Sequence, residues 1–148
     1  MEQVIQLFND NDIKYLVIGG QAIRLMGMPR YSMDWDLYIP GKDIENINKI
    51  NALLSNVLDM KLEPLGEKGQ SFIQTFQTIY GIIQFHLAPL ALPPFDKALQ
   101  HSITIVSETG IGVQCLSPED LYECKKQVNR PKDESDILFL EAKLIPKG

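Results

Sequence analysis

Two aspartates stand two positions apart in the stretch RYSMDWDLYIP, which runs from Arg30 to Pro40. Residues 35–39 read as a strand, and in a strand the side chains of Asp34 and Asp36 point to the same face. Two carboxylates on one face repel each other, and aspartate is a poor strand former. Solvent, a basic partner or a bound cation must therefore offset the repulsion, and Mg²⁺ prefers oxygen ligands of this kind.

A second set of residues, suited to bind an anion, precedes this pair. A short buried strand over residues 13–20 ends in Gly19 and Gly20, and a helix begins directly after them. Glycines let the backbone turn sharply and leave amide N–H groups uncovered, where a phosphate is favoured. Arg30, four positions before Asp34, can neutralise phosphate charge or pair with an aspartate. The ordered combination predicts a site for phosphoryl or nucleotidyl transfer, in which positioning and metal ions carry most of the catalysis.

The run YLVIGGQAIRLMGMPRYSMDWDLYI resembles the signature of the nucleotidyltransferase superfamily, which has the polymerase-β-like fold. It is most similar to the minimal bacterial members related to AbiEii toxins and to MNT-type antitoxins. The residues that fall on that signature are Gly19, Gly20, Gly27, Arg30, Ser32, Asp34 and Asp36. A late run, LSPEDLYECKKQVNRPKDESDILFL, resembles the family's closing segment through Leu116, Ser117, Glu119, Asp120, Leu121, Lys125, Arg130, Lys132, Asp133 and Asp136.

The resemblance implies a metal-dependent nucleotidyltransferase that moves a nucleoside monophosphate from a nucleoside triphosphate to a hydroxyl group. It implies that Asp34 and Asp36 are catalytic and bind Mg²⁺ or Mn²⁺. The residues that it assigns to the nucleotide are Gly19, Gly20, Gln21, Arg30, Ser32, Lys132 and Asp133. The acceptor stays open between a protein, an RNA end and a small molecule. A protein partner, a second copy of the chain and a toxin–antitoxin setting stay open as well.

The sequence departs from the family pattern on a later strand, where active members place a third carboxylate. The corresponding segment is GIIQFHLAPL, in which Gln84 and His86 share one face of the expected strand. One interpretation makes His86 a substitute base or ligand, and another takes the acid from Asp96 or Glu63. A third interpretation is a catalytically inactive nucleotide-binding or antitoxin-like regulatory protein on the same fold. A calcium- or sugar-binding domain is the weakest alternative, because no loop has the ligand spacing of a calcium site.

Helical and strand patterns follow one another along the chain. Apolar spacing predicts helices over residues 2–8, 21–27, 43–58, 93–100, 117–128 and 131–144, with Asp43 and Ser117 as N-caps. Strands are expected over 13–20, 35–39, 102–106 and 111–116, and two more over 71–87 that meet near Gly81. A helix is the alternative for the first half of 71–87, because Phe72, Phe76 and Tyr80 are four apart. The order predicts an α/β (α+β) fold, a mixed β-sheet flanked by helices.

The length of 148 residues fits one domain, 1–148, with a nucleotidyltransferase-like core over about 1–90 and a C-terminal strand and helix extension over about 91–148. With 14 basic and 19 acidic residues the formal charge is -5, which argues against a generally basic surface for nucleic acid. A local basic cluster near the last helices contains Lys125, Lys126, Arg130 and Lys132.

The sequence gives no sign of a membrane protein or of a disulfide framework. No apolar run approaches the length of a membrane span, and the N-terminus lacks the basic start and apolar middle of a secretory signal. We therefore expect a cytoplasmic protein with no membrane partner. Cys115 and Cys124 are nine positions apart without a nearby histidine cluster, so buried free thiols are the favoured interpretation.

Overall fold

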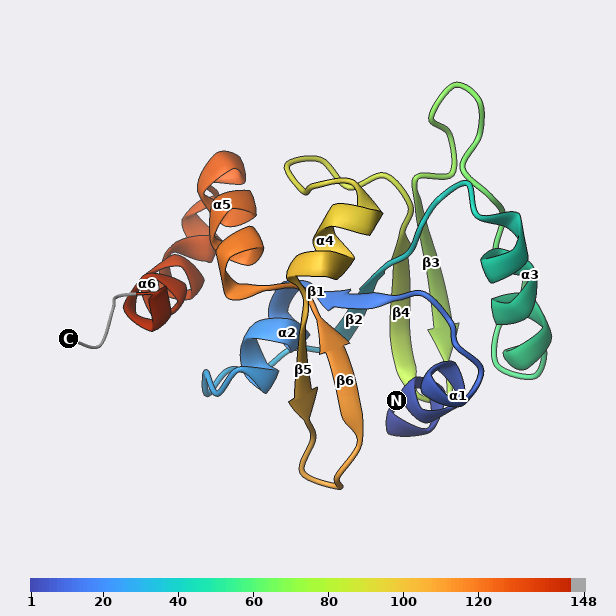
Figure 1. Ribbon diagram of the computed structural model, residues 1–148, viewed down its shortest axis with the longest axis horizontal. Helices are drawn as coiled ribbons and strands as arrows, with labels where there is room; N and C mark the ends of the chain where they lie inside the picture. The colour runs from blue at the N-terminus through green and yellow to red at the C-terminus, as the bar shows by residue number, and fades with distance from the viewer. Residues whose placement is uncertain (145–148) are drawn as a thin grey trace.

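A computed structural model describes residues 1–144, and its centre is a six-stranded sheet (Figure 1). The strands are β1 (Leu16–Ile18), β2 (Asp34–Tyr38), β3 (Ile73–Thr78), β4 (Gly81–His86), β5 (Ile103–Val106) and β6 (Gly112–Cys115). They lie in the order β3-β4-β2-β1-β6-β5, so the sheet joins strands from both the expected core and the expected extension. Parallel and antiparallel pairs both occur, which confirms the predicted mixed sheet.

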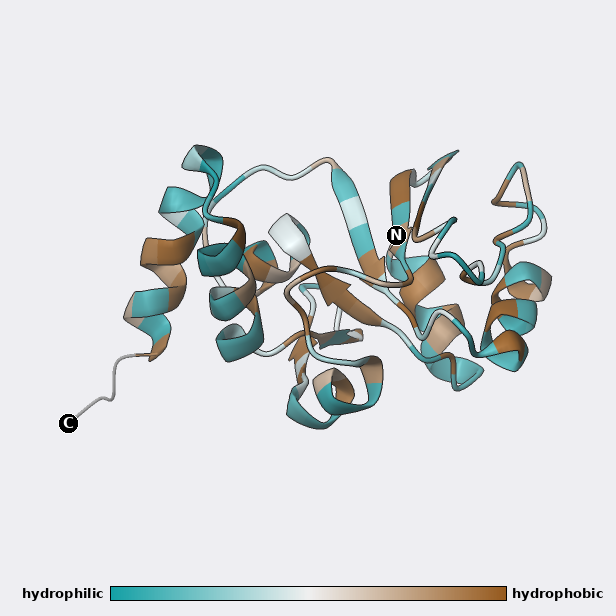
Figure 2. Ribbon diagram, turned by 90° about the horizontal axis from the view of Figure 1, so that it is seen from above, coloured by the Kyte–Doolittle hydropathy of each residue, from teal (hydrophilic) through white to brown (hydrophobic). Residues whose placement is uncertain are grey.

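Helices pack around this sheet and end the chain. They are α1 (Glu2–Asp10), α2 (Gly19–Leu25), α3 (Ile44–Leu53), α4 (Phe95–His101), α5 (Pro118–Val128), a 3₁₀ turn (Pro131–Asp133) and α6 (Glu134–Leu144). Figures 1 and 2 show α5 and α6 at one end of the elongated molecule and α1 and α3 at the other. The region 71–87 forms two strands, so the helical alternative for its first half is wrong.

The strand register decides which side chains share a face of the sheet. β1 and β2 are antiparallel with Ile18 opposite Asp36, and β2 and β4 are parallel with Asp36 opposite Gln84. Since side chains alternate along a strand, Asp34, Asp36, Gln84 and His86 all belong to the same face. That face is the one on which the sequence predicts the chemistry.

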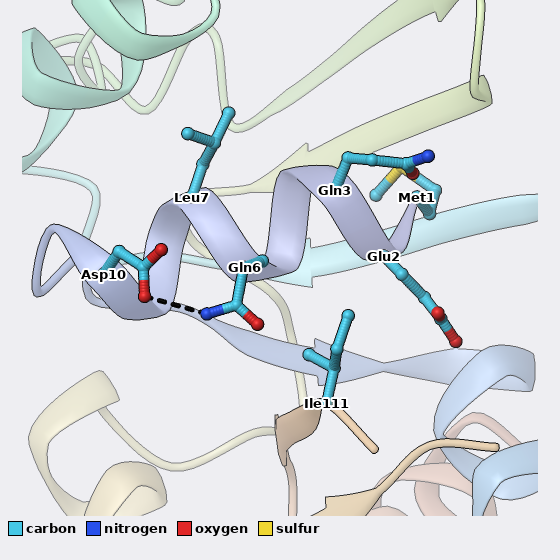
Figure 3. A pocket seen from close by; sticks show the side chains of 7 residues that line it. All are labelled: Met1, Glu2, Gln3, Gln6, Leu7, Asp10 and Ile111. Atoms are coloured by element: carbon cyan, nitrogen blue, oxygen red, sulfur yellow. Dashed lines mark hydrogen bonds between the residues drawn. The ribbon is translucent and has the colours of Figure 1, made fainter. Parts of the chain in front are cut away.

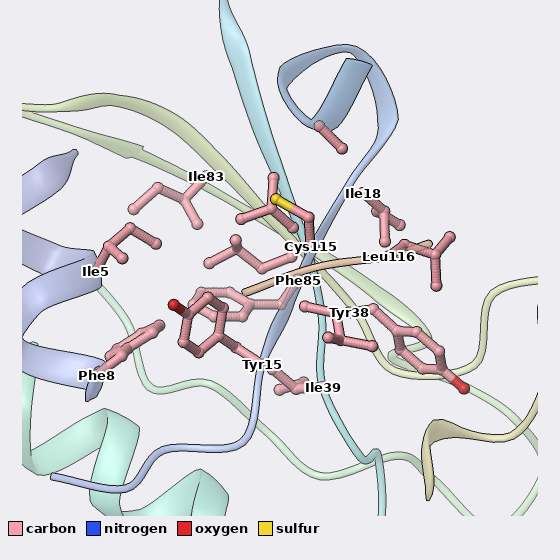
Figure 4. Packing of buried hydrophobic residues seen from close by; sticks show 14 of the residues in the cluster. Ile5, Phe8, Tyr15, Ile18, Tyr38, Ile39, Ile83, Phe85, Cys115 and Leu116 are labelled. Atoms are coloured by element: carbon pink, nitrogen blue, oxygen red, sulfur yellow. The ribbon is translucent and has the colours of Figure 1, made fainter. Parts of the chain in front are cut away.

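The opposite face of the central strands forms the hydrophobic core (Figure 4). Leu37 of β2 and Ile83 and Phe85 of β4 are fully buried, and they pack with Phe8 of α1 among others. In Figure 2 hydrophobic residues gather on the central strands, whereas the helices carry both kinds. A register slip by one residue would turn these side chains out of the core, at about 2 kcal/mol for each. Hydrophobic burial therefore fixes the orientation of the aspartates on the other face.

Two expectations from the composition can be compared with the structure. No helix within residues 1–144 has the length and apolar character that a membrane crossing requires. Both cysteines are free thiols, Cys115 buried and Cys124 half-buried. Burial raises the pKa of Cys115 to about 12, so this thiol is inert at neutral pH.

Both predicted N-caps are present. The Ser117 hydroxyl accepts a hydrogen bond from the Asp120 N–H at 3.1 Å, and Pro118 opens α5. The Asp43 carboxylate accepts one from the Asn46 N–H at 3.1 Å and another from Lys14 Nζ at 2.7 Å. The hydrogen bond from Lys14, together with that from Asn46, holds the pKa of Asp43 below its usual value.

We expect Asp43→Ala to lower the free energy of unfolding by about 1 kcal/mol at pH 7, because α3 loses its cap. Asp43→Asn keeps a cap acceptor and should retain most of this stability. Because the folded-state pKa is depressed, the advantage of Asp43 over alanine is present above its unfolded pKa and is lost as pH falls through the folded value. Urea unfolding of the three proteins at pH 7 and at acid pH measures this. An alanine variant as stable as the parent at pH 7 would contradict the assignment.

Candidate active site

The acidic pair, Asp34 and Asp36, lies at the start of β2 and lines one cleft with a volume of about 880 Å³. Both residues are half-buried, and they alternate with Trp35 and Leu37 along the strand. Asp36 is held in place, because its Oδ1 lies 2.8 Å from Nε2 of His86 on β4. The structure thus brings both aspartates together with both residues predicted for the missing third position, since Gln84 and His86 line the same cleft.

The glycine turn, Gly19–Gly20, adjoins this pair because β1 ends at Ile18, directly opposite Asp36. Gly19 has φ +69, and a Cβ there would lie 2.9 Å from Asp36 Oδ2. A Cβ on Gly20 would lie 2.9 Å from Ser32 Oγ and 3.2 Å from Arg30 Nη2. The positive φ and the close approach of Asp36 favour glycine at position 19, and at position 20 the missing Cβ lets the Ser32 and Arg30 side chains lie against the backbone.

The position of a third carboxylate is filled by neutral or basic groups. Gln84 lies opposite Asp36 in the register, and its amide nitrogen donates to Thr75 Oγ1 at 3.3 Å. The imidazole of His86 reaches across to the acidic pair. Asp96 and Glu63, the alternative sources of the acid, do not line the cleft. Among residues 1–144, the other carboxylates that line it are Asp133 and Asp136.

A buried ion-pair network closes the opposite side of the cleft. Asp136 of α6 accepts a hydrogen bond from Arg30 Nη1, and its Oδ2 is 3.2 Å from Lys125 Nζ of α5. Asp133 accepts from Lys125 at 3.1 Å and from Arg130 Nε at 2.7 Å. The side chains of Asp133 and Asp136 are only 3% and 5% exposed, so these acids depend on their cations for solvation.

The protonation of Asp133 reflects this network. Burial raises the pKa of the Asp133 carboxyl, but the hydrogen bonds from Arg130 and Lys125 outweigh burial and hold the pKa below its usual value. The hydrogen bond between Arg130 and Asp133 also raises the pKa of Arg130. Asp133 is therefore ionised and occupied by two cations, which assigns it to holding the cleft's basic residues rather than to contacting an anion itself.

The other predicted site residues divide into two groups. Gly19, Gly20, Arg30, Ser32, Lys132 and Asp133 line the same cleft as the acidic pair. Gln21 does not: its side chain is buried, its amide nitrogen donates to the Ser32 carbonyl at 2.8 Å, and its oxygen accepts from Arg24. Gln21 therefore supports the loop that carries Ser32. Lys125 and Asp136 join the site without having been assigned to it, although both lie on the matched closing segment.

A second hollow, of about 810 Å³, lies on α1 away from the acidic pair (Figure 3). Among residues 1–144, its lining includes Glu2 and Asp10 but neither lysine nor arginine, and Gln6 donates to Asp10 at 2.8 Å. Ile111 closes one side of it. Within residues 1–144, the lining of this hollow has neither a pair of acids on one strand face nor a glycine turn, which are the features that distinguish the cleft.

The donor set of the cleft decides which metal it fits. No cluster of three or more His, Cys, Asp or Glu side chains within residues 1–144 is arranged to enclose a metal ion. Two carboxylates on one strand face are instead the donor set with which Mg²⁺ binds when substrate phosphates and water complete its octahedron. The acidic pair fits a cation shared with a bound polyphosphate, and it does not fit a metal held by protein alone.

Solved structures of known proteins resemble the fold of this chain. TM1012 from Thermotoga maritima, described as a candidate nucleotidyltransferase, aligns with a TM-score of 0.67 and 12% identity over 95% of this chain and 89% of its own. The lincosamide adenylyltransferase LnuA, with lincomycin bound, aligns with a TM-score of 0.60 and 17% identity over 94% of this chain and 92% of its own. ANT(2'')-Ia in complex with adenylyl-2''-tobramycin aligns with a TM-score of 0.58 and 16% identity over 95% of this chain and 85% of its own. The chain has the nucleotidyltransferase fold.

No protein-family model matches the sequence, and no curated protein matches it significantly. The nucleotidyltransferase fold is nevertheless shown over nearly the whole chain, and the predicted fold class is confirmed. The resemblance to AbiEii-related and MNT-type members in particular stays a prediction.

Removing one charge tests the buried network of this fold. We expect Asp133→Asn to lower the free energy of unfolding by about 3 kcal/mol at pH 7, because two cations lose a buried partner. Since the pKa of Asp133 is depressed in the folded state, its contribution is present above its unfolded pKa and disappears as pH falls through the folded pKa. Glu141→Gln, at an exposed site on α6, is the matched control and should change stability little. Equal unfolding midpoints for both variants at pH 7 would disprove the role given to Asp133.

Proposed function

We propose that the protein is a metal-dependent nucleotidyltransferase that moves a nucleoside monophosphate from a nucleoside triphosphate to a hydroxyl acceptor. One observation carries the proposal: the acidic pair and the glycine turn meet in one cleft, with Gly19 against Asp36. A site for a metal shared with polyphosphate needs acids and an anion cradle in contact, and this contact is what the strand register produces.

The charge distribution supports a triphosphate beside the glycine turn. Arg30, Lys125, Arg130 and Lys132 line the cleft on the side of α5 and the 3₁₀ turn. Arginine and lysine so placed can bind phosphate oxygens, and the absence of a Cβ on Gly20 lets Ser32 and Arg30 approach the glycine turn closely. The buried acids Asp133 and Asp136 keep Lys125 and Arg30 from turning away from the cleft.

Asp34 and Asp36 would hold Mg²⁺ or Mn²⁺. The bound cation would neutralise charge on the phosphates and polarise the α-phosphorus, which are the usual contributions of a metal to this reaction. The protein's own part is to place both carboxylates on one strand face in one cleft and to hold Asp36 through its hydrogen bond with His86.

His86 would accept the proton of the attacking hydroxyl. In its neutral form, an Nε2–H donated to Asp36 leaves Nδ1 as an acceptor, and the carboxylate fixes this tautomer. The acceptor oxygen would bond to the α-phosphorus, the bond to the bridging oxygen would break, and pyrophosphate would leave. This role compensates for the third carboxylate that neither Gln84 nor His86 supplies.

A second candidate function is a catalytically inactive nucleotide-binding or antitoxin-like regulatory protein on the same fold. It is favoured by the same position, because within residues 1–144 no third free carboxylate faces the acidic pair. The similar structures support an enzyme with a small-molecule acceptor instead, since LnuA holds lincomycin and ANT(2'')-Ia holds an adenylylated tobramycin.

The proposal predicts metal-dependent consumption of α-labelled nucleoside triphosphates, measured as pyrophosphate release and as label transferred to acceptors. Asp34→Asn and Asp36→Asn should each lower the rate by about 10²-fold or more, because the metal loses a ligand. Asp96→Asn, outside the cleft on α4, is the matched control. Triphosphate binding without turnover in the parent protein would favour the regulatory alternative. If the parent neither binds nor consumes any triphosphate with Mg²⁺ or Mn²⁺, the proposal is wrong.

His86→Gln should lower the transfer rate by about 10²-fold while the affinity for triphosphate stays within about threefold, because a general base acts on the chemical step. His101→Gln is the control, since His101 lies on α4 and pairs with Asp120. Initial rates and calorimetric binding of the three proteins separate the two effects. A His86→Gln enzyme with the parental rate would remove the histidine from the mechanism.

A further inference from the structure

The cleft has two halves that differ in charge. Within residues 1–144, every lysine and arginine that lines it comes from the loop before β2, from α5 or from residues 130–132. None comes from β3, from β4 or from residues 88–92. The half that suits an anion is therefore confined to one side of the acidic pair.

The other half is an apolar wall, which we define as Phe72, Ile73, Ala88, Pro89 and Leu90. It is open to solvent although it is hydrophobic: Leu90 is 86% exposed, Phe72 49% and Ile73 43%. Exposed apolar side chains that gather in a cleft mark a binding surface more often than scattered ones do.

The apolar wall lies directly beside the groups that would perform the transfer. Ile73 of β3 is opposite His86 of β4, whose imidazole holds Asp36. Thr75 is opposite Gln84, so the floor between the wall and the acidic pair consists of neutral groups that can hydrogen-bond. An acceptor whose hydroxyl reaches Asp36 and His86 from this side must rest its body on Gln84 and Ile73.

The charges near the apolar wall exclude two classes of acceptor. A polycationic acceptor would need unpaired protein carboxylates near the wall. Asp133 and Asp136 instead lie across the cleft and are already paired with Lys125, Arg30 and Arg130. An RNA end would need cations for its backbone, and the wall and the neutral floor offer none. The surface that remains matches an uncharged molecule with hydroxyl groups on one part and hydrocarbon on another.

We propose, on the basis of the function proposed above, that the acceptor is a neutral, amphiphilic small molecule whose hydroxyl faces Asp36 and His86 and whose apolar part lies on the wall. The hydroxyl oxygen bonds to the α-phosphorus, the bond to the pyrophosphate oxygen breaks, and the hydroxyl proton passes to His86. The product is a nucleotidylated amphiphile and free pyrophosphate.

The test compares acceptors in one assay with an α-labelled nucleoside triphosphate and Mn²⁺. The probes are hexyl β-glucoside, glucose, the polycation kanamycin and a short RNA with a free 3′-hydroxyl. We expect label on hexyl β-glucoside at least about tenfold faster than on the other three, because only it can use the wall. Preferential labelling of kanamycin or RNA would overturn the inference, as would equal rates for glucose and its hexyl derivative.

Two variants connect the preference to the wall. Leu90→Ser, at an 86% exposed site, and Ile73→Asp should each lower the rate with hexyl β-glucoside about tenfold, while triphosphate affinity by calorimetry stays unchanged. Leu138→Ser, at a site 61% exposed on α6, is the control. Parental rates in both wall variants would overturn the inference, and so would loss of triphosphate affinity, which would assign the wall to the base of the nucleotide.

The failure of the two proposals can be told apart. If triphosphate binds and is turned over with metal but the preference among probes is absent, the acceptor class is wrong and the nucleotidyltransferase proposal stands. If no triphosphate binds or turns over, both are wrong. Hexyl β-glucoside can also be titrated into the free protein while the amide chemical shifts of Ile73 and Leu90 are monitored. This readout does not depend on catalysis.

Discussion

The antiparallel pairing of β1 with β2 is the contact on which the site depends. It places Ile18 opposite Asp36, so that the chain turns at Gly19 within contact distance of a carboxylate. The pairing is not set by the aspartates, which gain nothing from standing on one strand face. It is set by the buried side of the same strands, where Val17 and Leu37 lie opposite each other and are fully buried, so that a slipped register would expose them. The chemistry of one face is thus positioned by the hydrophobic packing of the other.

A second constraint links the two ends of the chain. Arg30 from the loop before β2 and Lys125 from α5 share Asp136 of α6, and Asp133 binds Lys125 and Arg130. Buried charges of this kind are costly alone and tolerable only together. Among the ion pairs of residues 1–144, only that between Arg30 and Asp136 joins α6 to the loop before β2, so separating the C-terminal helices from the sheet would leave Arg30 without this partner. Because all three of these cations line the cleft, the same ion pairs orient its anion-binding side.

Local pattern in the sequence predicts much of this arrangement. Alternation marks Asp34 and Asp36 as neighbours on one face, the pair of glycines marks the turn, and Asp43 and Ser117 mark the starts of two helices. The ambiguity over 71–87 arose because Phe72, Phe76 and Tyr80 fit a helix as well as a strand. In the structure the first half of this region is a strand, because β3 pairs antiparallel with β4.

Contacts between distant segments escape such patterns. The resemblance places His86 at the site of the acidic pair, but no local pattern indicates that its ring contacts Asp36, 50 positions away. Nothing near Lys125 indicates that it shares Asp136 with Arg30. Gln21 was assigned to the nucleotide by its place in the signature, yet the turn into α2 directs its amide inward to the Ser32 carbonyl. These features depend on how strands and helices pack, which periodicity does not encode.

The central claim is that the acidic pair and the glycine turn form one site for a metal bound with a triphosphate. Amide NMR spectra recorded with a non-hydrolysable nucleoside triphosphate and substoichiometric Mn²⁺ test it directly, because the paramagnetic ion broadens the signals nearest to it. The account predicts that broadening is strongest for Gly19, Gly20, Asp34, Asp36 and Gln84. Broadening centred elsewhere, for example on the acidic residues of α1, with these signals left sharp, would contradict it.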